Sequence, residues 1–407
     1  MQSAFRNREK QKRALSSAFR RNQARVEVTI WNIFVGCFTK ELWDFYPRAE
    51  RDMSLPSQGI ERLLFDDLNG SIKYAGSWGL GLSSPQYIQL HPSSSIIYAA
   101  EFAHPGRLTA LTIKSDGSLE QLSTIPTRGS MAVAVDLHPK GIRAYVAHLG
   151  DGTLTTCNLN ERGEIENANA FSGSFKSRRR GRPSSDPLGY GGGSSKLHHL
   201  RVLPRGDGLV VADVGLDQVV TYRLGEEGEL DEQPISRIQF PVGSAPRHIE
   251  FGPTGDYVFV VGECDATLYV LEAEDFVPVR IAGSYSVVPS SFRGRALPSE
   301  LQLHPDGSTL FIGVRRADCI TAFTIDELGV AEVMYHEPCQ GSNPRAVRID
   351  PVGRHLLVGH WQSNSISVFS IDAERRLNAI ENSITVPSPS SIAFVKTSIM
   401  QQPLAEL

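Results

Sequence analysis

The sequence predicts an all-β protein, and three features of its 407 residues support this prediction. Apolar and polar residues alternate with a period of two in short runs such as 300–304 (ELQLH), and this alternation is typical of half-buried strands. Turn-forming residues separate the runs, and the chain contains 36 Gly and 24 Pro. No segment sustains the 3.6-residue period that would predict an amphipathic helix.

A phrase ending in a turn proline recurs about every fifty residues. Its copies end at Pro92, Pro139, Pro204, Pro253, Pro305 and Pro351, with spacings of 47, 65, 49, 52 and 46 residues. The long interval contains a basic low-complexity segment, residues 171–196. Each copy holds one strand and is followed by three more, separated by polar turns. Four strands in a repeat of this length predict a blade of a β-propeller.

The number of repeats predicts a ring of seven blades in one domain. Six complete units begin near residues 85, 131, 197, 246, 298 and 344, and a seventh begins at Pro389, shortly before the chain ends. Segments 30–38, 60–67 and 71–78 would supply its missing strands, so that one blade combines both chain ends and closes the ring. We expect a propeller over residues 29–396, a flexible insert at 171–196, and tails at 1–28 and 397–407.

Composition limits the partners. Lys and Arg number 41 and Asp and Glu 45, a formal charge of −4, so no nucleic-acid partner is predicted. No membrane span is predicted, because no apolar run reaches about 18 residues. Five scattered Cys residues indicate reduced thiols in an intracellular protein, and we expect a cytoplasmic one. The Arg-rich segment 1–28 is either a disordered tail or a mitochondrial import sequence. The oligomeric state stays open.

Propeller geometry selects the candidate site residues. The first strand of each blade lines the central channel, and the second strand ends beside the start of the first, so both positions reach one face of the ring. Ionisable residues occupy both positions. First-strand starts carry His198, His199, Arg247, His248, Glu300 and Arg345, and second-strand ends carry Glu101, His148, Asp213, Glu263, Arg315 and His360.

These residue types indicate acid–base chemistry on an anion. Glu and His in one cleft can transfer protons near neutral pH, and Arg binds carboxylate or phosphate through paired hydrogen bonds. We therefore expect a small anionic metabolite as the ligand. The Arg content and the lack of HxH or HExxH spacing argue against a metal, and no cofactor is predicted. The insert 171–196 and the segment 283–297 are expected on this same face, either as lids or as tolerated surface insertions.

Several segments resemble the seven-bladed propeller lactonase family, which includes propeller-type 6-phosphogluconolactonases and fungal carboxy-cis,cis-muconate cyclases. The similarity covers residues 29–396. Its most specific parts are 246–263 (PRHIEFGPTGDYVFVVGE), 298–323 (PSELQLHPDGSTLFIGVRRADCITAF) and 343–369 (NPRAVRIDPVGRHLLVGHWQSNSISVF). The resemblance implies a lactone hydrolase or a lactonizing cyclase without a cofactor.

The resemblance also implies roles for particular residues. The family's catalytic positions fall on His198, with His199 as the alternative, and on Arg247, Glu263 and Arg315. We expect Glu263 or His198 to activate water or protonate the leaving alkoxide, and Arg247 and Arg315 to hold the anionic group. The expected substrate-binding residues are Glu300, Arg345, His248, His199, Glu101 and His148.

Three neighbours of these residues depart from the family pattern. Gly262 and Val314 stand where the family usually has Asn, and Leu149 stands where it usually has Tyr. These departures support an alternative function, in which the propeller is catalytically altered and serves as a binding platform.

Overall fold

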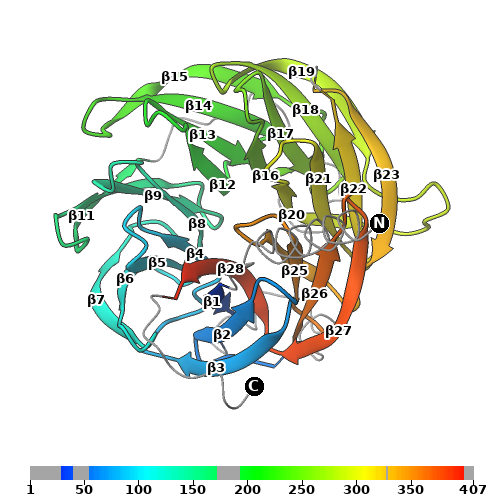
Figure 1. Cartoon of the computed structure of the whole chain (residues 1–407). Coiled ribbons are helices and arrows are strands. Elements are labelled where there is room, and N and C mark those ends of the chain that lie inside the picture. Colours follow the sequence, from blue (N-terminus) through cyan, green and yellow to red (C-terminus); the bar gives the residue numbers. More distant parts are fainter. Residues whose placement is uncertain (1–28, 40–54, 172–192, 327–328, 398–407) are drawn as a thin grey trace, which may run out of the picture.

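The computed structural model describes residues 29–39, 55–171, 193–326 and 329–397. Within these residues, 28 strands form seven four-stranded antiparallel sheets. Figure 1 shows the sheets arranged around a central channel, as the sequence predicts. The prediction of a seven-bladed β-propeller is confirmed.

The strands of each blade are named from the innermost to the outermost. Blade 1 contains β28 (Pro389–Lys396), β1 (Ile30–Cys37), β2 (Ile60–Asp66) and β3 (Ile72–Trp78). Blade 2 contains β4 (Tyr87–Leu90), β5 (Ile96–Glu101), β6 (Arg107–Ile113) and β7 (Leu119–Pro126). Blade 3 contains β8 (Ala132–Leu137), β9 (Arg143–His148), β10 (Leu154–Leu159) and β11 (Ile165–Phe171). Blade 4 contains β12 (Leu197–Val202), β13 (Gly208–Asp213), β14 (Gln218–Leu224) and β15 (Leu230–Gln239).

The remaining blades follow the same order along the chain. Blade 5 contains β16 (Pro246–Phe251), β17 (Tyr257–Gly262), β18 (Thr267–Glu274) and β19 (Val277–Ser286). Blade 6 contains β20 (Leu297–Leu303), β21 (Thr309–Arg315), β22 (Cys319–Ile325) and β23 (Ala331–Pro338). Blade 7 contains β24 (Pro344–Ile349), β25 (His355–His360), β26 (Ser365–Ile371) and β27 (Leu377–Thr385).

Strands from the two ends of the described chain share blade 1, and this closes the ring. The last strand, β28, is the innermost strand of the blade and pairs antiparallel with β1, with Val35 opposite Ile392. Figure 1 shows β28 and β1 side by side next to the channel. Because the ring is closed, each sheet packs between two neighbouring sheets, and no blade has a face without a neighbour.

The core lies between neighbouring blades. Apolar side chains of one sheet pack against those of the next, as where Ala100 and Ala110 of blade 2 meet Val135 and Val146 of blade 3. The histidine before the turn proline explains part of the repeated phrase. His138 donates through Nε2 to the carbonyl of Gly206 in the next blade at 3.2 Å. His91 and His304 make the corresponding bonds at 3.1 and 2.9 Å.

Several expected features fall outside the described residues. These are the basic segment 1–28, most of the insert (residues 172–192), and residues 398–407. The other predicted loop is described and joins β19 to β20 over residues 287–296. Within the described part of the chain, no helix is long and apolar enough to cross a membrane.

Ring closure gives the first prediction. Ile392 is 1% exposed in the core between blades 1 and 7. Ile392→Ala should lower the free energy of unfolding by about 2–5 kcal/mol, because it leaves a cavity in the closing strand. Lys396→Ala changes an exposed residue of the same strand and should stay within about 0.5 kcal/mol of wild type. Denaturant unfolding compares the two variants, and equal losses would contradict the assigned role of β28.

Candidate active site

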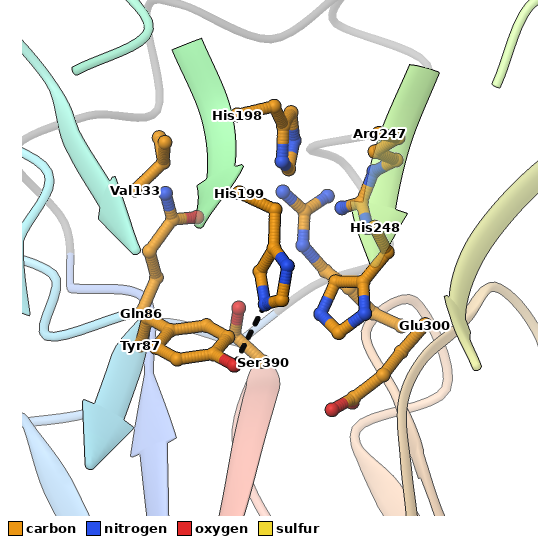
Figure 2. Close-up of a pocket in the computed structure, with 10 residues that line it drawn as sticks. Gln86, Tyr87, Val133, His198, His199, Arg247, His248, Glu300 and Ser390 are labelled. Atoms are coloured by element: carbon orange, nitrogen blue, oxygen red, sulfur yellow. Dashed lines mark hydrogen bonds between the residues drawn. The ribbon is translucent and has the colours of Figure 1, made fainter. Parts of the chain in front are cut away.

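A pocket opens at one end of the central channel. The space between its lining atoms, counted together with the open solvent at the mouth, is about 350 Å³. All seven blades contribute lining residues. The lining consists of Gln86, Tyr87, Val133, His198, His199, Arg247, His248, Glu300, Arg345 and Ser390. Figure 2 shows these side chains gathered from the starts of the innermost strands.

A β-bulge at the start of each of several innermost strands places consecutive residues at the pocket. In blade 4, Leu197 pairs with Asp213 and His199 with Ala212, so His198 is the extra residue. The same shift makes Arg247 the extra residue of β16 and Arg345 that of β24. A bulge breaks strict alternation and redirects a side chain. This is why neighbours such as His198 and His199 both line one pocket.

A residue in the left-handed region precedes the bulged strands β16 and β24, and also β8, which has the same bulge at Val133. Met131, Ala245 and Asn343 stand directly before β8, β16 and β24 with φ of 60°, 55° and 63°. A non-glycine residue adopts this conformation only when the surrounding structure enforces it. This turn therefore sets the direction in which β8, β16 and β24 begin.

Arg247 is held from behind by two residues that do not line the pocket. Its Nε lies 3.4 Å from Oε1 of Glu263, and its Nη1 donates to the carbonyl of Ser299 at 2.5 Å. The same Glu263 oxygen pairs with Nη2 of Arg315. Arg315 in turn donates from Nε to the carbonyl of Leu297 at 3.1 Å. Glu263 and Arg315 thus form a buried ion-pair cluster that orients Arg247.

Arg345 is positioned by aromatic rings. Its guanidinium carbon lies 4.8 Å from the ring centre of Phe38 and 5.6 Å from that of Trp361. Both rings are buried. A cation over an aromatic face is attracted to the ring electrons, and packing on two rings restricts its rotamers. The pocket therefore presents two pre-ordered guanidinium groups, Arg247 and Arg345.

The histidine rings of the pocket are uncharged at neutral pH. Burial lowers the pKa of His198 well below its usual value, and the charges of Arg247 and Arg345 lower it further. Burial likewise lowers the pKa of His199 and of His248. The rings of His199 and His248 stack with centroids 3.6 Å apart. Nδ1 of His198 and of His248 is buried and has no hydrogen-bond partner among the described residues.

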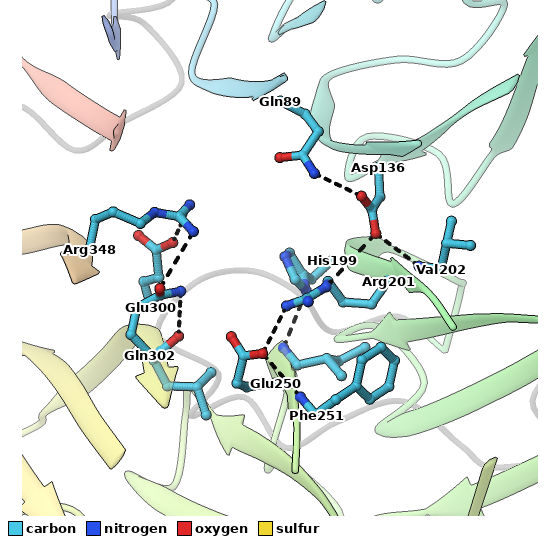
Figure 3. A network of polar contacts seen from close by, with 12 residues as sticks. Gln89, Asp136, His199, Arg201, Val202, Glu250, Phe251, Glu300, Gln302 and Arg348 are labelled. Atoms are coloured by element: carbon cyan, nitrogen blue, oxygen red, sulfur yellow. Dashed lines mark hydrogen bonds and ion pairs between the residues drawn. The ribbon is translucent and has the colours of Figure 1, made fainter. Parts of the chain in front are cut away.

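A second polar layer lies two or three residues further along the innermost strands, next to the pocket lining. Arg201 bridges Asp136 and Glu250, at 3.8 and 3.1 Å. Glu300 joins the two layers, because it lines the pocket while its carboxylate accepts from Arg348 at 3.2 Å and from the backbone of Val347 at 2.9 Å. Figure 3 shows these contacts around the channel.

The structure brings six of the ten predicted site residues to the pocket and places four elsewhere. Glu101 bonds to Arg107 and Thr109 inside blade 2, and His148 bonds to Thr127 and Thr153 inside blade 3. Like Glu263 and Arg315, they end the second strand of a blade. That strand is one position away from the channel, so these side chains reach the loops around the pocket and not its lining.

Sequence reasoning missed Gln86, Tyr87, Val133 and Ser390 as lining residues. Tyr87 carried a usable signal, because it stands five residues before its turn proline, as His199 and His248 do before theirs. Tyr87 was missed because only charged and histidine side chains at this position are selected as candidates.

Among the described residues, no group of three or more His, Cys, Asp or Glu side chains is arranged to hold a metal ion. The fold and site thus define a seven-bladed propeller with a cationic, histidine-rich pocket at one end of its channel. A family model described as "Lactonase, 7-bladed beta-propeller" matches residues 32–394. The chain belongs to this family. Its members are enzymes of lactone chemistry, and this is the class expected from the sequence.

Individual relatives are distant. A 6-phosphogluconolactonase of Formosa agariphila is 23% identical over 377 residues, covering 88% of this chain and 98% of its own. One of Bacillus subtilis is 24% identical over 325 residues, covering 77% and 88%. The structure of a periplasmic gluconolactonase of Pseudomonas aeruginosa superposes with a TM-score of 0.76 at 23% identity, covering 91% of this chain and 100% of that one. At this identity the superposition supports the fold alone.

The buried cluster behind Arg247 gives the second prediction. Glu263→Gln should lower the free energy of unfolding by about 3–5 kcal/mol, because two buried guanidinium groups lose their carboxylate. Glu101→Gln is the control in blade 2, where Glu101 ends β5 one position earlier in the repeat than Glu263. Its partner Arg107 is 36% exposed, so water compensates the lost pair and the effect should be smaller. Equal unfolding midpoints of the two variants would contradict this description.

Proposed function

We propose that the protein is a lactone hydrolase acting on a small lactone that carries a carboxylate or a phosphate. The observation that carries the proposal is the placement of two pre-ordered guanidinium groups beside neutral histidines in one pocket. Arg247 and Arg345 suit an anionic substituent, and they also stabilise negative charge that develops on the reacting carbonyl. Of the substrates named for the relatives, 6-phosphogluconolactone belongs to this chemical class, whereas gluconolactone carries no charge.

In this proposal His198 is the general base. Its ring lines the pocket, and a neutral imidazole can accept a proton from water. Water then adds to the lactone carbonyl carbon, and its proton passes to His198. The ring C–O bond breaks, and the leaving alkoxide takes that proton back. The product is a hydroxy acid, which releases one proton to solvent on ionising at neutral pH.

Glu263 and Arg315 act in this proposal through Arg247, which they hold in place. The cyclase reaction would use the same pocket in the direction of ring formation. No observation on the described residues favours it over hydrolysis.

A panel of lactones tests the proposed function by pH-stat. It contains a phosphorylated sugar-acid δ-lactone, the same lactone without phosphate, and an unsaturated γ-lactone with a carboxylate. We expect hydrolysis of an anionic lactone with a kcat/KM at least about tenfold above that of the neutral analogue. The free energy of one charge-assisted hydrogen bond to the anionic group accounts for this ratio. Formation of lactone from an open-chain unsaturated acid would instead support the cyclase. If no member of the panel is turned over or bound, the hydrolase and the cyclase are both contradicted and the binding platform is favoured.

Arg345 tests the anion site. Arg345→Met should lower kcat/KM for the anionic lactone by about 10²-fold, since a charge-assisted hydrogen bond to charged groups is worth up to about 3 kcal/mol, and should leave the neutral analogue nearly unchanged. Arg376→Met is the control, because Arg376 also lies over an aromatic ring, that of Tyr335 at 4.7 Å, but outside the pocket lining. An equal loss for both lactones would contradict binding of the anion by Arg345.

The pH dependence follows from the charges around His198. Burial comes first among the causes that lower its pKa, followed by Arg247, Arg345, His199 and Arg315. In the free enzyme the base should therefore stay unprotonated, and kcat/KM should be constant, down to below pH 6.5. A bound anion offsets the two arginine charges, so the acid limb of kcat should lie at higher pH than that of kcat/KM. Coincident limbs, or a fall in kcat/KM centred on pH 6.5, would contradict this role.

A further inference from the structure

Tyr87 stands at the pocket in a hydrogen-bond chain that fixes the direction of its hydroxyl group. It begins β4, and its Oη lies 3.1 Å from Nε2 of His199 in blade 4. Figure 2 shows the phenol pointing across the pocket toward this imidazole. The two rings meet edge to face with centroids 5.7 Å apart. Tyr87 and His199 lie 112 positions apart in the sequence, and they come into contact because their blades belong to one ring.

The backbone determines which nitrogen of His199 carries the proton. The amide of Ile249 in the next blade donates to Nδ1 of His199 at 3.2 Å. A backbone N–H can only donate, so Nδ1 must be the unprotonated nitrogen. The neutral ring then carries its proton on Nε2 and donates it to Tyr87.

The same inter-blade bond recurs around the channel, which shows that it belongs to the architecture. Val347 donates its amide to Glu300 of the preceding blade at 2.9 Å. Ile88 donates to Ser391 at 3.2 Å. All three amides stand four residues before their turn proline, on the edge of an innermost strand that faces the neighbouring blade. His199 therefore occupies the acceptor position of this inter-blade bond, which Glu300 and Ser391 occupy in other blades.

Because Tyr87 accepts from His199, its own hydroxyl hydrogen is directed away from that ring. The stacked ring of His248 holds His199 in place from the other side. Burial raises the pKa of Tyr87 above its usual value, and the charge of Glu300 raises it further, so the phenol keeps its proton at neutral pH. The result is a neutral donor with a fixed orientation in the same pocket as Arg247 and Arg345.

We propose that Tyr87 is a further catalytic residue, whose hydroxyl, oriented by His199, donates a hydrogen bond to the oxygen that becomes negative as the lactone ring opens. This inference rests on the proposed function. No covalent bond to Tyr87 forms, and its proton is not transferred. A donor that is already oriented toward developing charge lowers the barrier, because it does not have to reorganise during the reaction. His199 is a positioning residue in this scheme, since it acts on the substrate only through Tyr87.

The kinetic test compares two tyrosines of blade 2. Tyr87→Phe removes only the hydroxyl, and we expect kcat for the best lactone of the panel to fall by about 10²–10³-fold, the usual cost of losing one oxyanion donor. KM should change by less than about threefold. Tyr98→Phe is the matched control, because Tyr98 is buried in the same blade and donates to the carbonyl of Gly163 at 2.6 Å, away from the pocket. Its kcat should equal that of wild type.

Two variants of His199 test the positioning role. His199→Gln keeps one donor and one acceptor, and His199→Phe keeps the ring stacking but removes both. We expect the Gln variant to retain clearly more kcat than the Phe variant, with little difference in KM. Equal activity of the two would show that His199 contributes packing alone.

A spectroscopic measurement tests the hydrogen-bond chain without turnover. Two-dimensional ¹H–¹⁵N spectra of the histidine rings distinguish the two tautomers, and the His199→Gln spectrum identifies the His199 signals. We expect the Nε2–H tautomer in wild type near neutral pH. A protonated Nδ1 or a doubly protonated ring would overturn the proposal.

The outcomes separate this proposal from the proposed function. A wild-type protein that opens lactones, with unchanged kcat in Tyr87→Phe, overturns the role of Tyr87 alone. A rise in KM at constant kcat does the same, since it would show that the hydroxyl binds the ground state. A wild-type protein that opens no lactone overturns the proposed function and, with it, the catalytic role of Tyr87.

Discussion

The β-bulge at the start of the innermost strands is the constraint on which the site depends. Regular alternation would send successive side chains to opposite faces of a blade. With one extra residue, His198 and His199 of one strand and Arg247 and His248 of the next all reach the same pocket. The circular arrangement of the blades then brings Tyr87 of blade 2 within hydrogen-bond distance of His199 of blade 4. The pocket is thus a property of the closed ring and of no single blade.

Charge distribution explains why the pocket combines fixed cations with neutral bases. Buried guanidinium groups need partners, and they find them on the side away from the pocket, in Glu263 for Arg247 and in two aromatic rings for Arg345. Burial first, and then the charges of Arg247 and Arg345, lower the pKa of His198 and keep its ring unprotonated. An anionic ligand would relieve this repulsion, so binding and base strength are coupled through the same groups.

The fold was predictable because six of the seven blades repeat a turn proline at regular spacing, and because the strands at the two chain ends supply the seventh blade. The site was predictable in part. Counting from the turn proline located the strand starts, and so it found His198, Arg247 and Arg345. It also located Glu263 and Arg315 at the ends of second strands, but it did not show that their side chains pair with each other behind Arg247 instead of lining the pocket. Nor did any sequence signal reveal the tautomer of His199, which depends on an amide of the adjacent blade.

A crystal structure with the hydroxy-acid product of an accepted lactone tests the central claim most directly. The account predicts the anionic group of the product against Arg247 and Arg345, with a carboxylate or hydroxyl oxygen within about 3 Å of Tyr87 Oη, the usual hydrogen-bond distance. Product bound at the opposite end of the channel, or in this pocket without contact to either arginine, would contradict it.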